Sequence, residues 1–282
     1  FNRRSKAPSV AYVKLTLTER FPRLVVARTA KAGDGNVYLG PVASTAAAKL
    51  VIEAIESVIP LRRCTAKPAA APIRDAPCAP AQLGVSTCPC AGAIAEADYR
   101  LLADAARTAL TVDPRRVLDP LAARMAALAA AHRYEEAAAT RDRASAFARA
   151  VRRQWRLDAL RRTGHVRLVS AGEGGCVLRD GILEEAWADG SEPPPPSLPF
   201  DVDTDEGGRG RVGDGAGDGE GPIPPDTAEE RAVVAAWIEA RAARGRLVLL
   251  EADRGIAWPA IDLPRYEPIR RGTTRSPGAS AA

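Results

Sequence analysis

Residues 118–142 read LDPLAARMAALAAAHRYEEAAATRD, and this stretch decides the fold class. Large apolar side chains recur there at spacings of three and four, the period of one helix face. After a break at His132-Arg133 the same spacing resumes at Tyr134 and continues to Trp155. Two such stripes joined by two residues predict an antiparallel helical hairpin at about 119–156. Its first stripe consists of Leu118, Leu121, Met125 and Leu128.

Aspartate-proline pairs mark where helices should begin in this region. Asp113-Pro114 and Asp119-Pro120 each place an N-cap aspartate before a proline, whose missing N–H costs nothing at the first helical position. We therefore expect the first helix of the hairpin to begin at Asp119-Pro120.

The hairpin has too narrow and too alanine-rich a stripe to be stable alone. It must therefore pack either against the rest of the chain, as an internal support, or against a second helical hairpin. An aromatic anchor with paired charges is typical of a partner interface. The candidate partner-binding residues are Leu121, Met125, Leu128, Tyr134, Glu135, Ala138, Arg141 and Asp142.

Strand and helix signals on both sides of the hairpin predict an α+β fold. Alternation at Val13, Leu15 and Leu17 predicts a half-buried strand, followed by apolar runs at 24–27 and 36–39 and a helix capped by Ser44. The predicted units are 1–64, a basic strand-helix unit; 65–92, a cysteine-containing connector; 93–165, helical; 166–189, a β-hairpin; 190–226, a disordered acidic linker; 227–271, a helix-strand unit; and 272–282, a disordered tail.

Charge is distributed unevenly along the chain. Residues 1–74 hold 13 basic and 4 acidic side chains, whereas residues 191–230 hold 11 acidic and 2 basic ones. A basic front end suits a polyanion such as nucleic acid, although a solvated basic surface would look the same. The candidate phosphate contacts are Arg3, Arg4, Lys6, Lys14, Arg20 and Arg23, which would position DNA without reading its sequence.

Five cysteines occur, and four of them fall between residues 64 and 90. An odd number without an export signal argues against a disulfide framework. Cys64, Cys78, Cys88 and Cys90 are therefore candidate metal ligands, with reduced structural thiols as the alternative, and Cys176 is a candidate core residue.

No apolar run reaches the length of a membrane helix, and we expect a cytoplasmic protein.

Several spaced motifs resemble the C subunit of bacterial excinuclease. The hairpin sequence is similar to the UVR motif, through which the C and B subunits of that enzyme associate. Further landmarks resemble the region after the GIY-YIG nuclease core of the C subunit, in the family's order: Phe1-Asn2, Tyr12-Val13-Lys14-Leu15-Thr16, Glu19-Arg20-Phe21-Pro22-Arg23, Tyr38-Leu39-Gly40-Pro41 and Pro60-Leu61-Arg62-x-Cys64. The resemblance covers residues 1–165.

The resemblance implies a DNA-repair nuclease with DNA and a B-like subunit as partners. It implies a divalent metal, Mg or Mn, in a nuclease core upstream of this chain, and a supporting catalytic role for Asn2. It also implies an iron–sulfur cluster at the cysteines, although Ser86 stands where the third cysteine belongs and Cys88 is displaced by two; a zinc ion is the other possibility. The layout is similar to fusions with a DnaQ-like exonuclease, so a non-catalytic adaptor or an accessory region of a 3′–5′ exonuclease is the alternative function.

Overall fold

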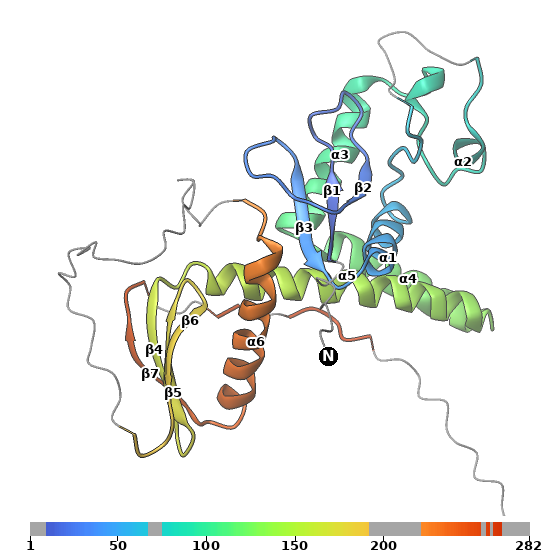
Figure 1. Cartoon of the computed structure of the whole chain (residues 1–282). Coiled ribbons are helices and arrows are strands. Elements are labelled where there is room, and N and C mark those ends of the chain that lie inside the picture. The colour runs from blue at the N-terminus through green and yellow to red at the C-terminus, as the bar shows by residue number, and fades with distance from the viewer. Residues whose placement is uncertain (1–9, 67–74, 192–220, 255–257, 260–261, 267–282) are drawn as a thin grey trace, which may run out of the picture.

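The computed structural model describes residues 10–66, 75–191, 221–254, 258–259 and 262–266. These residues form two β-sheets, each with its own helices, and one long helix, α5, crosses between them (Figure 1). The α+β class expected from the sequence is confirmed. Asn2, Arg3, Arg4 and Lys6 lie outside the described residues, as do most of the predicted acidic linker and the whole predicted tail.

The first sheet is antiparallel, with the strand order β2-β1-β3. It consists of β1 (Ala11–Leu15), β2 (Leu24–Ala27) and β3 (Val37–Val42). The alternation in β1 buries Val13 and Leu15 in the main core, as predicted. Helix α1 (Thr45–Glu56) begins after Ser44, whose hydroxyl oxygen accepts a hydrogen bond from the N–H of Ala47. This cap satisfies one of the free donors of the first turn.

Three helical segments follow α1, two of them within the 65–92 connector and the third directly after it. They are α2 (Ala79–Gln82), the 3₁₀ turn η1 (Pro89–Ala91) and α3 (Glu96–Thr111). Tyr99 on α3 is fully buried in the main core, so α3 anchors the connector to the first sheet.

The hairpin consists of α4 (Arg115–Ala130) and α5 (Tyr134–Leu160). The expected start at Asp119-Pro120 is wrong, because α4 begins at Arg115 and includes Pro120. The helix begins directly after the earlier Asp113-Pro114 pair, although Pro114 is the N-cap and no side chain caps the first turn. Pro120 lies in the second turn of α4, where it removes one helical hydrogen bond. The helix continues through it because the first turn has already formed at Arg115.

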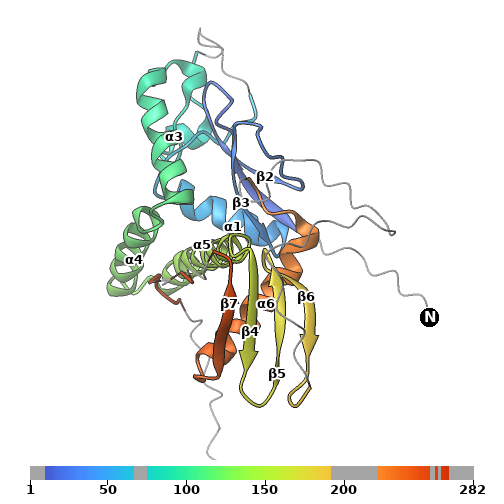
Figure 2. The same cartoon turned by 90° about the vertical axis from the view of Figure 1, so that its left-hand side faces the viewer.

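The second sheet is also antiparallel, with the order β6-β5-β4-β7. Its strands are β4 (His165–Ser170), β5 (Gly174–Arg179), β6 (Ile182–Trp187) and β7 (Leu247–Ala252), and helix α6 (Pro225–Ala242) covers one face (Figure 2). The sequence pattern predicts that 166–189 and 227–271 are separate units. In the structure β7 pairs with β4, because each segment alone has too few strands to bury an apolar face.

The chain before α6 lies against the first sheet and joins the two halves of the molecule. The Tyr12 hydroxyl on β1 donates a buried hydrogen bond of 2.7 Å to the carbonyl of Ile223. Both residues are fully buried, and burial raises the pKa of Tyr12 to about 12. The start of α6 is accordingly seen beside β3 and above α5 in Figure 1.

Tyr12→Phe should destabilise the protein by about 1–3 kcal/mol, because the buried Ile223 carbonyl loses its donor. The free energy of unfolding from urea denaturation measures this loss, and amide hydrogen exchange should rise in 221–228. Tyr134→Phe is the matched control: its hydroxyl bonds to His132 at an exposed position and should contribute under about 0.5 kcal/mol. Equal effects of the two variants would contradict the prediction.

Candidate partner-docking and nucleic-acid surfaces

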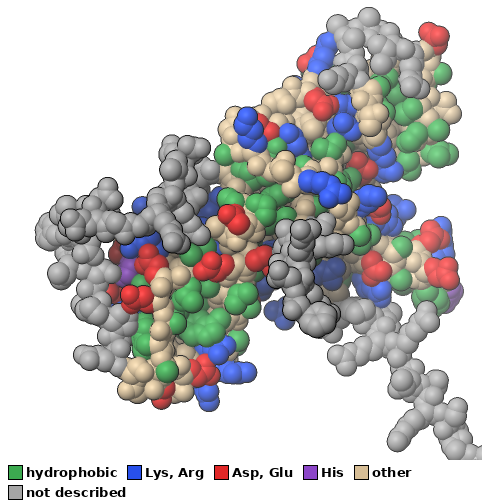
Figure 3. All heavy atoms as spheres, in the orientation of Figure 1, with side chains coloured by type: hydrophobic (Ala, Val, Ile, Leu, Met, Phe, Trp, Pro, Cys, Tyr) green, Lys and Arg blue, Asp and Glu red, His purple; other side chains and the backbone are tan. Residues whose placement is uncertain are grey.

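The α4–α5 hairpin projects beyond the two sheets, and its turn lies at the far end (Figure 1). Acidic, basic and histidine side chains gather at this projecting end (Figure 3). The turn comprises residues 131–133, and His132 has a positive φ of 57°. His132 Nδ1 lies 2.8 Å from the Tyr134 hydroxyl, and Arg133 forms a bidentate ion pair with Glu136. The tip is therefore locally ordered by its own side chains.

The predicted partner-binding residues divide into two groups. Leu121 and Leu128 are buried, so they hold the hairpin together and are not available to a partner. Exposed side chains form the outer surface, and Tyr134 has 62% of its surface exposed. We call this surface the hairpin tip; its exposed or partly exposed members are Met125, Tyr134, Glu135, Ala138, Arg141 and Asp142.

The base of the hairpin, by contrast, is covered by the chain itself. Arg152 donates hydrogen bonds to the carbonyls of Leu263 and Pro264, and Ser145 donates one to the carbonyl of Tyr266. Leu263 is buried in the main core. The base of the hairpin is therefore internal support, as one of the two alternatives predicts. The described part of the chain leaves Tyr134 at the tip exposed, and docking onto a second helical hairpin stays a prediction.

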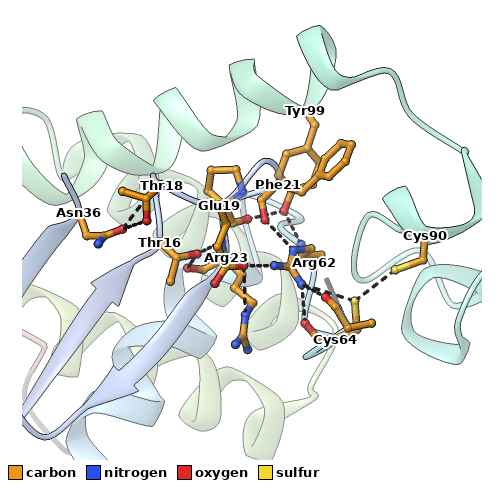
Figure 4. Close-up of polar contacts among 12 residues, drawn as sticks. Thr16, Thr18, Glu19, Phe21, Arg23, Asn36, Arg62, Cys64, Cys90 and Tyr99 are labelled. Atoms are coloured by element: carbon orange, nitrogen blue, oxygen red, sulfur yellow. Dashed lines mark hydrogen bonds and ion pairs between the residues drawn. The ribbon is translucent and has the colours of Figure 1, made fainter. Parts of the chain in front are cut away.

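Arg62, which belongs to the Pro60–Cys64 motif, is the centre of a buried polar network (Figure 4). Its side chain is 1% exposed, and its guanidinium donates to the carboxylate of Glu19 and to the carbonyl of Phe21. Two more bonds reach the carbonyls of Cys64 and Ala66. These bonds use four of the five N–H donors of a guanidinium, and the side chain is buried, so Arg62 serves the fold and is not placed to hold a phosphate.

Tyr99 completes this network from α3. Its hydroxyl donates to the carbonyl of Pro22 at 2.6 Å and accepts from the N–H of Arg62 at 2.9 Å. The Glu19–Arg23 and Pro60–Cys64 motifs are thus adjacent in space because one arginine and one tyrosine join them. No spacing rule in the sequence would have indicated this pairing, since 43 residues separate Glu19 from Arg62.

The four clustered cysteines lie near one another. Cys64 Sγ is 3.7 Å from Cys90 Sγ, and Cys88 interacts with both Cys78 and Cys90. Burial raises the pKa of Cys90 to about 11, whereas hydrogen bonds from Cys78 and nearby backbone N–H groups outweigh burial and lower the pKa of Cys88.

These contacts run from thiol to thiol, and in the described ranges no three ligand side chains are arranged to hold a metal ion. A metal at these cysteines stays a prediction. Cys176 is 7% exposed within the core under α6, and burial raises the pKa of its thiol to about 11.

The predicted phosphate contacts that the structure describes are all near carboxylates. The ion pairs are Lys14–Asp34 at 3.0 Å, Arg20–Glu96 at 2.5 Å and Arg23–Glu19 at 3.7 Å. Arg20 is the most exposed of the three cations, at 40%. A phosphate would therefore have to compete with a carboxylate for each of them, which limits what each contributes.

No described helix is long and apolar enough to span a bilayer.

Comparison with known proteins matches residues 10–109 to the UvrC/Cho excinuclease middle domain. Similar relatives include UvrABC system protein C of Lachnospira eligens, 32% identical over 134 residues, and that of Syntrophotalea carbinolica, 35% identical over 145 residues. The protein of the same name from Rhodospirillum rubrum is 33% identical over 139 residues. No solved structure matches the chain.

These matches cover 48%, 51% and 49% of this chain but only 22%, 23% and 21% of the respective relatives. About half of the chain is thus similar to a segment that makes up about a fifth of the length of these relatives. It is UvrC-like over this part and resembles a nucleotide excision repair nuclease, as its sequence motifs predict.

Glu56, the last residue of α1, has a buried carboxyl group near the polar network of Arg62 and Tyr99. Burial raises its pKa to about 7, against the opposing effect of Arg63 at 2.9 Å. The folded protein therefore binds a proton here that the unfolded chain releases near pH 4.5. The contribution of Glu56 to the free energy of unfolding is therefore fully present below pH 4.5 and is lost as the pH rises through about 7.

Glu56→Gln should remove this loss, because the amide cannot ionise. We expect the urea midpoint of the wild type to fall more between pH 5 and pH 8 than that of the variant. Glu185→Gln, at an exposed carboxylate on β6, should follow the wild type. Parallel pH profiles for wild type and Glu56→Gln would show that Glu56 does not titrate in this window.

Proposed function

We propose that this chain is the docking and DNA-positioning part of a DNA-repair nuclease of the excinuclease C kind. The hairpin tip would bind a UvrB-type subunit, and the basic first half would contact DNA phosphates. Incision of the phosphodiester would belong to a nuclease core of the same protein, to which Asn2 would lend support. Similarity to the UvrC/Cho middle domain supports the class of protein.

The observation that carries the docking proposal is the contrast along one hairpin. At the base, α4 and α5 pack on their own chain, and Leu121 is 1% exposed. At the tip, Tyr134 stays 62% exposed although it is a large aromatic side chain. An exposed aromatic with charges of both signs around it is the composition of an interface hot spot.

The charges at the tip are only partly paired with one another, so a partner can form ion pairs there. Arg141 pairs with Asp142 at 2.8 Å, and Glu135 has no ion-pair partner among the described residues. A second helical hairpin could match these charges while covering the Tyr134 ring and the partly exposed Met125. The two pairs of helices together would bury the apolar surface that one pair leaves open.

The DNA-binding part of the proposal is carried by Lys14, Arg20 and Arg23. Because each has a carboxylate close by, we expect these residues to contribute a modest, salt-dependent attraction to phosphates and no base specificity.

Tyr134→Ala should weaken binding of a purified UvrB-type subunit by at least about tenfold, since a central aromatic anchor contributes on the order of 2 kcal/mol. Arg141→Ala should weaken it as well. Surface plasmon resonance with the immobilised subunit measures both effects. Leu101→Ala, which removes an apolar side chain that is 68% exposed on α3, is the matched control and should bind normally. Unchanged binding by both tip variants would remove the docking role.

Arg20→Ala should weaken binding to duplex DNA and reduce the slope of log affinity against log salt by about 1. Glu96→Gln should have the opposite effect on affinity, because it frees Arg20 from its ion pair. Fluorescence anisotropy across a salt titration measures both. The control is Arg107→Ala, a similarly exposed arginine paired with Asp104 on the same helix as Glu96. Wild-type behaviour of both Arg20→Ala and Glu96→Gln would exclude Arg20 as a phosphate contact.

A further inference from the structure

Two adjoining hollows lie where α5 ends between the two sheets. Their volumes are about 430 and 370 Å³, and they share Thr111, Trp155, Asp158 and Arg162 as lining residues. The first hollow also reaches Arg254, and the second reaches Tyr38 on β3. Each volume is in the range of a small-molecule site. Trp155 and the arginines lie outside the residues that match the excinuclease middle domain.

The lining is positively charged, with three arginines against one aspartate. Arg161 is 9% exposed and is fixed by Asp158 at 3.0 Å and by the carbonyl of Gly221 at 2.6 Å. Its buried Nε has no hydrogen-bond partner among the described residues. Oδ1 of the neighbouring Asp158 likewise has no hydrogen-bond partner among these residues. A buried donor or acceptor without a partner is costly, so this place offers both a donor and an acceptor to a bound molecule or to water.

The other two arginines are exposed at the mouth. Neither Arg162 nor Arg254 lies within ion-pair distance of a carboxylate among the described residues, unlike the predicted phosphate contacts of the first sheet. Arg254 follows Asp253, which is held to His165 by a reciprocal pair of hydrogen bonds at 3.0 and 3.1 Å. The backbone next to Arg254 is thus tied to the strand that follows α5. Free guanidinium groups at a fixed mouth favour an anion such as a phosphate.

Aromatic rings provide the other half of the lining. Trp155 is partly buried and borders both hollows, and Tyr38 borders the second. An indole beside arginines offers a planar base a stacking surface, and every base has a π-face that can use it.

Few polar groups are left to read a base edge. Asn36 bonds to Thr18 and to the backbone of Asp34, and Gln154 bonds to Gly40 and Asp158. Each of these amides already uses its carbonyl oxygen and one of its two N–H groups. The lining can therefore hold a phosphate and a ring but has little means to distinguish bases.

We propose that these hollows bind one nucleotide, with its base stacked on Trp155 and its phosphate held by Arg161, Arg162 and Arg254. Two sources share this chemistry: a free mononucleotide and a nucleotide within single-stranded DNA. The inference adds a site to the proposed function. It rests on that function only in taking DNA as one of the two sources, since the hairpin tip contributes nothing to the hollows.

The test uses the full chain with fluorescein-labelled oligo(dT) and oligo(dA) in anisotropy, and with dTMP and dAMP in calorimetry. Trp155→Ala should weaken binding by at least about fivefold, whereas Trp155→Phe should retain most of it. The double variant Arg162→Ala/Arg254→Ala should weaken binding and lower the salt slope by about 0.7 for each phosphate interaction that it removes. Thymine and adenine ligands should bind within a few-fold of each other.

Arg149→Ala is the matched control, because it removes an exposed arginine from the same helix outside the hollows. Binding of the mononucleotides together with the oligonucleotides would support a free-nucleotide site, and binding of oligonucleotides alone would support a DNA-borne one. Wild-type binding by Trp155→Ala and by the double arginine variant would overturn the proposal. Because both arginines are exposed, the double variant tests it even if Trp155→Ala misfolds. Tyr134→Ala should bind oligonucleotide normally, so failure of docking and failure of this site are separable.

Discussion

Helix α5 packs into every apolar core of the described chain, and the rest of the structure depends on this packing. Phe147 and Val151 are buried in the main core with α1 and the first sheet, whereas Leu160 is buried in the core under α6. Leu157 closes a third, smaller cluster with Ile223. Because alanines occupy much of the buried face, neighbouring helices can approach closely. An isolated α5 with so few large side chains would be marginal, so the two halves stabilise a helix that in turn orients them.

Much of the fold follows from local sequence patterns. The alternation in β1, the Ser44 cap of α1 and the start of α5 at Tyr134 each depend on a few neighbouring residues, and each is where the pattern places it. The predicted stripe of α5 is right only in part, because Ala144, Ala148 and Val151 are buried whereas Tyr134 is exposed. Asp119-Pro120 fails for a physical reason: a helix that has already begun at Arg115 tolerates a proline in its second turn. The pairing of β7 with β4 was beyond local reasoning, because it depends on a contact between strands that are about 80 residues apart.

The candidate sites show the same division. Tyr134 could be identified from its position at a helix start and its charged neighbours. Arg62 and the hollows at Trp155 could not, because their partners come from distant segments: Glu19, Phe21 and Tyr99 for Arg62, and Tyr38 and Arg254 for Trp155. Ion pairs between distant residues cannot be predicted from the sequence pattern either. The pattern suggests that Arg20 is free to bind a phosphate, but in the folded chain Glu96 lies 2.5 Å away.

A single uninterrupted helix also sets a distance. Tyr134 and Trp155 both belong to α5, and at about 1.5 Å per residue their backbones are about 32 Å apart along its axis. That length is close to one turn of B-form DNA. A subunit bound at Tyr134 would thus lie at a fixed distance from a ligand bound at Trp155. Inserting one residue between them would lengthen the separation by about 1.5 Å and rotate Tyr134 relative to Trp155 by about 100° about the helix axis. The helix therefore fixes both the distance and the relative orientation of these two side chains.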